Sequence, residues 1–237
     1  MARKKMDLGD NMSMVLKKDS AINKEYPARD VFAASWAAYR LNGFQYLRPY
    51  NTLESHQMVN RERMLNLLED TSQLSEEDYA IGEKMREHSC RFTMIALTRQ
   101  LNSFEQMAAE ASLLDTVKGN PHFAVITSLS PGFHREMQRR ERSTRIGKLI
   151  TGKHIGTIKQ NIKIAGAKVI TSQHSQKYLK CYTHAEYEGN LIGWWGDDLY
   201  NTDNLLNLNA RVKEHCIWNS DDGPVPLTKL NYVRIFR

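Results

Sequence analysis

Residues 177–195 read KYLKCYTHAEYEGNLIGWW, and this stretch decides the fold of the C-terminal third of the chain. Up to Tyr187, small or apolar residues alternate with polar and aromatic ones, as expected for a strand with one buried face. The alternation predicts an inner row of Leu179, Cys181, Thr183 and Ala185 and an outer row of Tyr178, Lys180, Tyr182 and His184. Glu188-Gly189-Asn190 then predicts a hairpin turn. The returning strand contains Trp194-Trp195, and only one of these neighbours can face the core.

Three more alternating segments surround this hairpin. The first is expected from about residue 155 to residue 171 with a bend at Gly166, and the other two lie in LLNLNARVKEHCIW (205–218) and LTKLNYVRIFR (227–237). In the fourth strand the predicted inner row is Leu206, Leu208, Ala210 and Val212, and the predicted outer row is Asn207, Asn209, Arg211, Lys213 and His215. A short helix is expected at 197–204. Together the five strands predict a small closed β-barrel over residues 151–237.

The N-terminal half has the periodicity of helices. Pro27 suits the first position of a helix, and Ser75 with Asp78 forms a capping-box pattern. Asn102-Ser103 predicts another helix start, and Gly119-Asn120-Pro121 breaks the pattern. We therefore expect an α+β protein with a basic flexible arm (1–26), a mainly helical domain (27–132), a basic linker (133–150) and the barrel (151–237). The linker is either a solvated helix or a basic strip that extends a binding surface of the barrel.

The charge balance favours a polyanionic partner. The 237 residues include 33 Lys and Arg against 27 Asp and Glu, which gives a net charge of +6 and. Three scattered cysteines without C-x-x-C spacing indicate neither a disulfide framework nor a zinc ribbon and. The N-terminus is basic but lacks an apolar run, and no segment is apolar enough to span a bilayer. These features predict a cytoplasmic protein, in the host cell if the chain is viral.

No motif points to catalysis. IGKLITGKHIG (146–156) has the wrong spacing for a phosphate-binding loop and leads into a strand where that loop requires a helix and. GDD at 196–198 has no second acidic strand beside it, and the histidines show no metal-like pairing with cysteines and. We therefore expect no enzyme activity, no catalytic residue, no metal and no cofactor.

The order of the C-terminal segments resembles the OB-fold domain of bacteriophage proteins that bind single-stranded DNA. The resemblance lies in the order of five segments, at Gly156, Gly189, Asn190, Trp194, Val212, Lys213, His215, Thr228, Leu230 and Val233. More weakly, SEEDYAI and LNSFEQMA resemble the helical N-terminal half of such proteins. The last hairpin departs from the pattern, because Asn231-Tyr232 precedes the valine where the family commonly has Lys or Arg. The resemblance implies a five-stranded OB-fold that binds single-stranded DNA in phage replication, recombination or transcription.

A binder of single strands needs cations for the phosphates and aromatic rings for the bases. The candidate nucleic-acid-binding residues are Tyr178, Lys180, Tyr182, His184, Trp195, Arg211, Lys213, His215, Trp218, Tyr232 and Arg234. The helical domain is expected to supply contacts for self-association or for a polymerase, helicase or primase. The rival hypothesis is an interaction subunit of a replication or transcription complex whose barrel binds protein, because a fold does not settle function.

Overall fold

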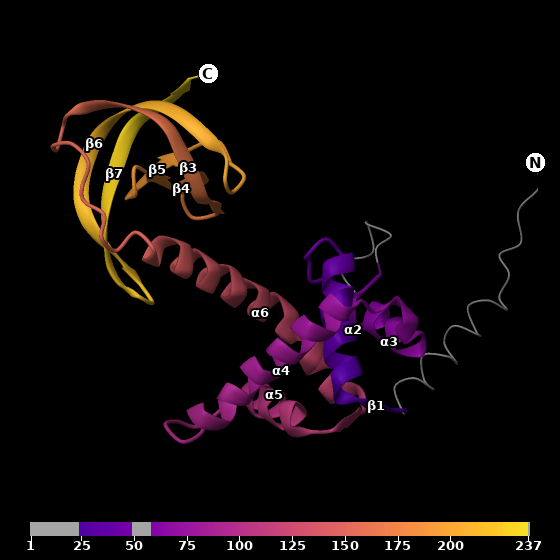
Figure 1. Ribbon diagram of the computed structural model, residues 1–237. Helices are drawn as coiled ribbons and strands as arrows, with labels where there is room; N and C mark the ends of the chain where they lie inside the picture. The colour runs from indigo at the N-terminus through magenta and orange to yellow at the C-terminus, as the bar shows by residue number, and fades with distance from the viewer. Residues whose placement is uncertain (1–23, 49–57, 237) are drawn as a thin grey trace, which may run out of the picture. The chain divides into compact units, whose positions relative to one another are not determined.

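A computed structural model describes residues 24–48 and 58–236 (Figure 1). The chain divides into two compact units, Met1–Arg135 and Glu136–Arg237. Most of the predicted arm, 1–26, lies outside the described residues.

The first unit is mainly helical, as predicted. Its elements are β1 (Glu25–Pro27), α2 (Ala28–Leu41), α3 (Asn60–Glu69), the short 3-10 helix η2 (Thr71–Gln73), α4 (Glu76–Ile95), α5 (Ser103–Leu113), β2 (Thr116–Lys118) and the first part of α6 (Asn120–Gly147). The capping box predicted at Ser75 is present, and the helix start predicted at Asn102 also forms a capping box, with Glu105. The three-residue pairing of β1 with β2 is too short to leave a periodic signal in the sequence.

Helix α6 runs farther than the sequence suggests. It continues through Pro131-Gly132 and includes most of the predicted linker 133–150, so that the boundary between the two units falls within this helix. Proline lacks a backbone N–H and disfavours a helix interior, but this cost can be offset by packing on both sides of it. Leu129 and Phe133 are both buried, and they hold the helix on either side of Pro131.

Close packing of α2 against α4 gives the first prediction. A Cβ atom built on Gly82 would lie 2.6 Å from the backbone nitrogen of Ala33 and 2.9 Å from the carbonyl carbon of Phe32. Backbone atoms cannot move aside without separating the helices. We therefore expect Gly82→Ala to lower the free energy of unfolding by about 1–3 kcal/mol in denaturant titrations.

Gly132→Ala provides the matched control for this prediction. It is also a helical glycine, but nothing lies within 4 Å of its added Cβ. The better helix propensity of alanine should raise stability there by about 0.5–1 kcal/mol. Equal effects of the two substitutions would show that Gly82 is not a contact point between helices.

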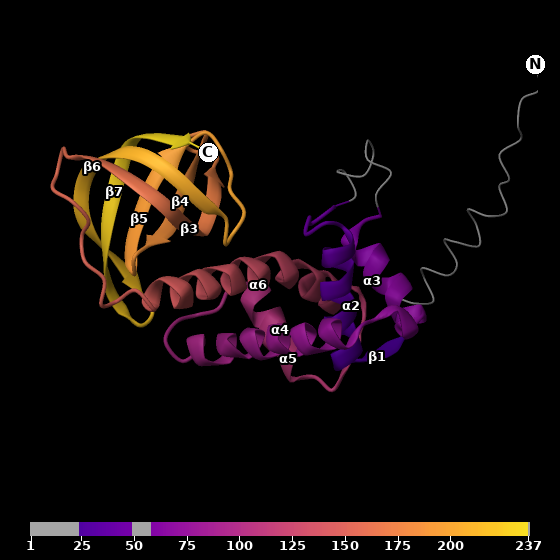
Figure 2. The ribbon, with the colours of Figure 1, turned by 45° about the horizontal axis from the view of Figure 1, so that its top comes forward.

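The second unit contains a five-stranded mixed β-sheet that closes on itself (Figure 2). Its strands are β3 (Asn161–Ser175), β4 (Lys180–Tyr187), β5 (Asn190–Gly196), β6 (Leu205–Ser220) and β7 (Gly223–Phe236). They pair in the order β3-β4-β5-β7-β6, and β6 returns to β3. All pairs are antiparallel except β5 with β7.

The interior of this barrel follows the predicted alternation in β6 and in β4 from Cys181 to Ala185, but Leu179, predicted to face inward, is 77% exposed and precedes β4. The inner row of β6, from Leu206 to Val212, is buried and packs with Trp194, Ile192 and Leu230. The chain bends where expected, because Gly166 has a φ of 76° and the register of β3 against β6 shifts between Ile164 and Ala167. Only a left-handed backbone gives this bend, and glycine adopts it without strain.

Two expectations for the barrel were wrong. Residues 197–204 form turns instead of the short helix expected between the third and fourth strands. The first strand begins at Asn161, later than residue 155, because Gly156 and Lys159 have left-handed φ values of 64° and 73° that prevent an extended strand and.

Candidate functional site

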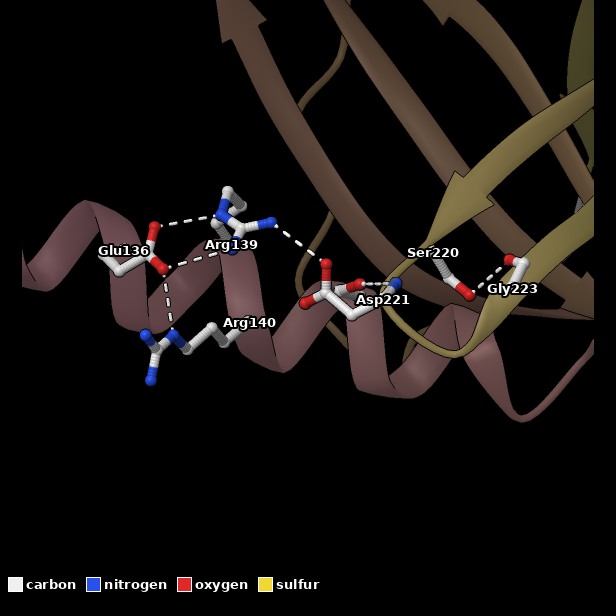
Figure 3. Close-up of polar contacts among 7 residues, drawn as sticks. Glu136, Arg139, Arg140, Ser220, Asp221 and Gly223 are labelled. Atoms are coloured by element: carbon white, nitrogen blue, oxygen red, sulfur yellow. Dashed lines mark hydrogen bonds and ion pairs between the residues drawn. The ribbon is translucent and has the colours of Figure 1, made fainter. Parts of the chain in front are cut away.

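The second half of α6 covers part of the outer surface of the barrel. Ile146 and Leu149 pack there against Ile170, Leu191, Val225 and Leu227, and together they form a second apolar core. The turn between β6 and β7 is tied to the helix as well, because the backbone N–H of Asp221 donates to Ser143 Oγ at 2.8 Å. Arg139 lies 3.3 Å from the Asp221 carboxylate and also pairs with Glu136 (Figure 3).

This covering helix explains why His184 is not an exposed binding residue, contrary to the sequence prediction. Its position in β4 does face outward, between Tyr182 and the ring of Trp218. The side chain is nevertheless buried, and its Nε2 atom has no hydrogen-bond partner among the described residues. Burial, assisted by the nearby charge of Arg142, lowers the pKa of His184 to about 4. Trp218, another predicted residue, is half-buried and packs against the second apolar core.

His215 does not belong to the outer row either. The register between β6 and β7 shifts from Val212–Leu230 to Glu214–Lys229, so Lys213 is an extra residue in β6. A bulge of this kind reverses the inward and outward positions that follow it. His215 therefore pairs with the fully buried Thr228 and stacks on His154 with ring centroids 4.4 Å apart.

Three of the predicted aromatic residues lie together. They are Tyr178, Tyr182 and Trp195, and we call them the aromatic cluster. The rings of Tyr178 and Tyr182 lie 5.1 and 4.7 Å from the Trp195 ring, centroid to centroid. Trp195 is 43% exposed, whereas Trp194 is buried in the barrel. Trp195 is therefore the tryptophan that faces outward. Lys180 is exposed on β4 and forms a long ion pair of 3.9 Å with Asp197. The cluster offers exposed aromatic faces, and Lys177 lies over the Tyr178 ring at 5.2 Å.

Gly193 allows Tyr182 to lie flat on the sheet within this cluster. A Cβ atom at Gly193 would come within 2.7 Å of the Tyr182 hydroxyl oxygen, so a side chain there would lift the ring. Burial raises the pKa of Tyr182 to about 12. The phenol therefore stays neutral at physiological pH and acts as a ring surface and hydrogen-bond donor.

Two of the predicted cations, Arg211 and Arg234, lie in a second place, which we call the cationic groove. It is an open hollow of about 590 Å³ on β3, β6 and β7, lined by Asn161, Ile162, Lys163, Asn209, Ala210, Arg211, Tyr232 and Arg234. No acidic residue lines it. Within residues 24–48 and 58–236, none of Lys163, Arg211 and Arg234 forms an ion pair. Arg211 instead donates from Nε to the Lys159 carbonyl at 2.9 Å, and Lys163 lies over the Phe236 ring at 5.0 Å.

Tyr232 stands out in this groove. It is 76% exposed, and its φ of 52° lies in the left-handed region that residues with bulky side chains rarely adopt and. The pairing of β7 with β6 skips from Asn231 to Arg234, so Tyr232 occupies a bulge. Bulges and strained residues of this kind often turn a side chain towards a ligand.

Sequence reasoning missed Lys163. The residue lies in the first predicted strand, but without the position of β6 nothing distinguished it from other exposed lysines. Its place beside Arg211 follows from the pairing of Ile162 with Ala210 and of Asn161 with Arg211. Lys213 is exposed on the same strand as Arg211 but does not line the groove.

The aromatic cluster and the cationic groove lie at opposite ends of β3. Tyr182 pairs with Gln173 near the end of that strand, whereas Arg211 pairs with Asn161 at its start. A strand rises about 3.3 Å per residue, so the path along β3 between these points is on the order of 40 Å. The predicted single surface is therefore two separate surfaces on one barrel.

Comparison with protein-family models, curated proteins and solved structures finds no match. The assignment of a role therefore depends on the chemistry of the two surfaces. Among the residues that the structure describes, no helix is long and apolar enough to cross a membrane. The same residues contain no group of three or more His, Cys, Asp or Glu side chains placed to hold a metal ion.

Proposed function

We propose that this protein binds single-stranded DNA without catalysing a reaction, and that it acts in phage replication, recombination or transcription. The cationic groove carries the proposal. Three cations without carboxylate partners, together with an exposed tyrosine, provide in one hollow the phosphate contacts and the stacking surface that single strands require and.

The strand order supports an OB-fold as the scaffold. Numbered within the barrel, the strands follow the closed order 1-2-3-5-4 with strands 3 and 5 parallel, an arrangement compatible with the five-stranded Greek-key barrel of OB-folds and. In such barrels the face of strands 2 and 3 contacts oligonucleotides. The aromatic cluster lies on the equivalent strands, β4 and β5, and would offer a second place for bases to stack.

Removing two groove cations tests the proposal. We expect Arg211→Ala with Arg234→Ala to weaken binding of a fluorescein-labelled oligothymidine in anisotropy titrations. For single strands each phosphate contact contributes about 0.7 to the slope of log affinity against log salt concentration, so the double variant should lose about 1.4 from this slope.

Lys118→Ala with Arg140→Ala is the matched control, because it removes the same charge from exposed side chains that pair with Glu25 and Glu136. An unchanged slope in the groove variant would reject this groove as the binding site. If the unaltered protein shows no single-strand binding even at low salt, the interaction-subunit hypothesis takes precedence. The barrel and the helical unit would then be examined for binding to a polymerase, helicase or primase, or to a second copy.

The aromatic cluster makes a separate prediction. Because stacking contributes roughly 1–3 kcal/mol per base, Trp195→Ala should lower single-strand affinity by about 10- to 100-fold with little change in the salt slope. Trp195→Phe should retain most of the affinity, since it keeps an aromatic face. An affinity equal to that of the unaltered protein in the Trp195→Ala variant would restrict the binding surface to the cationic groove.

A further inference from the structure

A polar cavity lies where the second half of α6 meets the outer side of β3, within the unit Glu136–Arg237. Its volume is about 270 Å³, and its lining is Gln138, Glu141, Arg142, Arg145, Ile170, Thr171, Ser172, Gln173 and Thr202. None of these residues lines the cationic groove, and none belongs to the aromatic cluster.

The charges in this cavity do not cancel. Arg145 lies 3.4 Å from both Glu141 and Asp203. Glu141 is the single carboxylate in the lining, and it is therefore already ion-paired with Arg145. Arg142 makes only one hydrogen bond, from Nη1 to Gln173 Oε1 at 2.5 Å, and has no carboxylate partner in the described parts of the chain. Its guanidinium is therefore an uncompensated cation.

The surroundings of Arg142 make this cation costly. Burial, together with the charge of Arg139, lowers the pKa of Arg142. The nearby His184 cannot supply the anion, because an imidazole is either neutral or positive, and its lowered pKa of about 4 keeps it neutral at physiological pH. Arg142 is half-buried, and a cation partly removed from water without an anion is costly, so a bound anion would supply the missing charge.

The cavity has the donors that a phosphate group requires. A guanidinium presents a planar fork of N–H groups that matches two phosphate oxygens. The Thr171 hydroxyl makes no hydrogen bond with another described residue and lines the same cavity. The other hydroxyls are already used, since Ser172 bonds to Thr183 and Thr202 donates to the Ile170 carbonyl.

We infer that this cavity is a phosphate-binding site in which Arg142 and Thr171 hold the phosphate oxygens. The nearest source is a DNA phosphodiester, because Gln173 of the lining pairs with Tyr182 of the aromatic cluster. A strand whose base stacks on that cluster would have backbone phosphates in reach of Arg142. The phosphodiester source depends on the proposed function, but the phosphate site does not.

Inorganic phosphate is the first probe, added to the full chain at constant ionic strength maintained with chloride. We expect saturable broadening or shift of the phosphate ³¹P resonance and a Tm that rises with phosphate concentration. Arg142→Gln should lower phosphate affinity at least tenfold, while Arg140→Gln, an exposed ion-paired arginine on the same helix, should leave it unchanged. Without phosphate, Arg142→Gln should be at least as stable as the unaltered protein because the uncompensated cation is removed.

Thr171→Val is the second variant, and it should weaken phosphate binding without removing a charge. If Arg142→Gln and the unaltered protein gain the same Tm with phosphate, the effect is general salt exclusion and the inference is wrong. It is also wrong if the ³¹P resonance of phosphate does not respond to the protein.

Oligothymidines with and without a 5′-phosphate distinguish the sources of the phosphate group. Equal weakening of both by Arg142→Gln identifies an internal phosphodiester, and weakening of only the phosphorylated one identifies a strand end. If Arg142→Gln affects neither oligonucleotide but abolishes inorganic phosphate binding, the ligand is a free phosphate compound. Because Arg211→Ala with Arg234→Ala should leave inorganic phosphate binding intact, the two proposals can fail separately.

Discussion

Asp78→Ala is expected to lower the free energy of unfolding by about 3–5 kcal/mol, a large share of the roughly 5–15 kcal/mol by which domains are stable. The Asp78 carboxylate is fully buried and receives hydrogen bonds from Arg40 Nε and Nη2 at 3.0 and 2.8 Å. It also accepts from the backbone N–H and hydroxyl of Ser75, which closes the capping box of α4. Burial alone would raise the pKa of Asp78, but the bonds from Arg40 and Ser75 outweigh it and hold the pKa below its usual value.

Alanine at position 78 leaves Arg40 beside α4 without its anion and removes half of the helix cap. Denaturant titrations followed by circular dichroism would measure the loss, with the exposed Glu77→Ala in the same helical turn as the control. Glu77→Ala should change stability by less than about 1 kcal/mol, through the helix dipole and the charge of Glu77 near Arg40. A similar effect of the two substitutions would mean that the Arg40–Asp78 pair does not hold α2 to α4.

Acidification should destabilise the barrel through His184. The folded protein holds the pKa of this side chain at about 4, against an ordinary value of 6.5. Between these two pH values the unfolded chain binds a proton that the folded chain does not, so stability is complete above pH 6.5 and falls as the pH drops towards 4. At about 1.4 kcal/mol for each pH unit of this difference, the loss amounts to about 3 kcal/mol.

His184→Phe tests this pH dependence. The free energy of unfolding of the unaltered protein, measured from pH 7 down to 5, should fall steadily, and that of the variant should fall much less. The pKa of His154 is also lowered, by burial and by His215, so part of the slope should remain. His174→Gln replaces an exposed histidine of β3 and should retain the full slope. Parallel curves for His184→Phe and the unaltered protein would exclude His184 as the source.

The barrel strands could be predicted from sequence because alternation reports burial directly. The inner row of β6 from Leu206 to Val212 and the choice of a hairpin at Gly189-Asn190 follow from residue type alone. The alternation stops predicting burial in β6 at the bulge formed by Lys213. One extra residue, Lys213, reverses every later position of β6, and no residue type marks a bulge at a lysine and.

The candidate site was harder to predict because its exposure depends on distant parts of the chain. His184 does lie on the outer face of β4, but α6 covers that face from a position about 40 residues earlier in the sequence. Which cations share a groove likewise depends on the pairing of β3 with β6. Local patterns therefore indicated the faces of β6 correctly up to its bulge at Lys213, but not which parts of those faces reach solvent.

The place of β7 in the barrel bears on how this protein is synthesised. β7 is the last of the five strands in chain order, yet it pairs with both β5 and β6 and so joins the two ends of the sheet. While a ribosome is still adding residues before β7, the nascent sheet has open edges that can pair with other chains. The helical unit has no such dependence and can fold first. A ribosomal pause just before Gly223 would thus expose the sheet to aggregation.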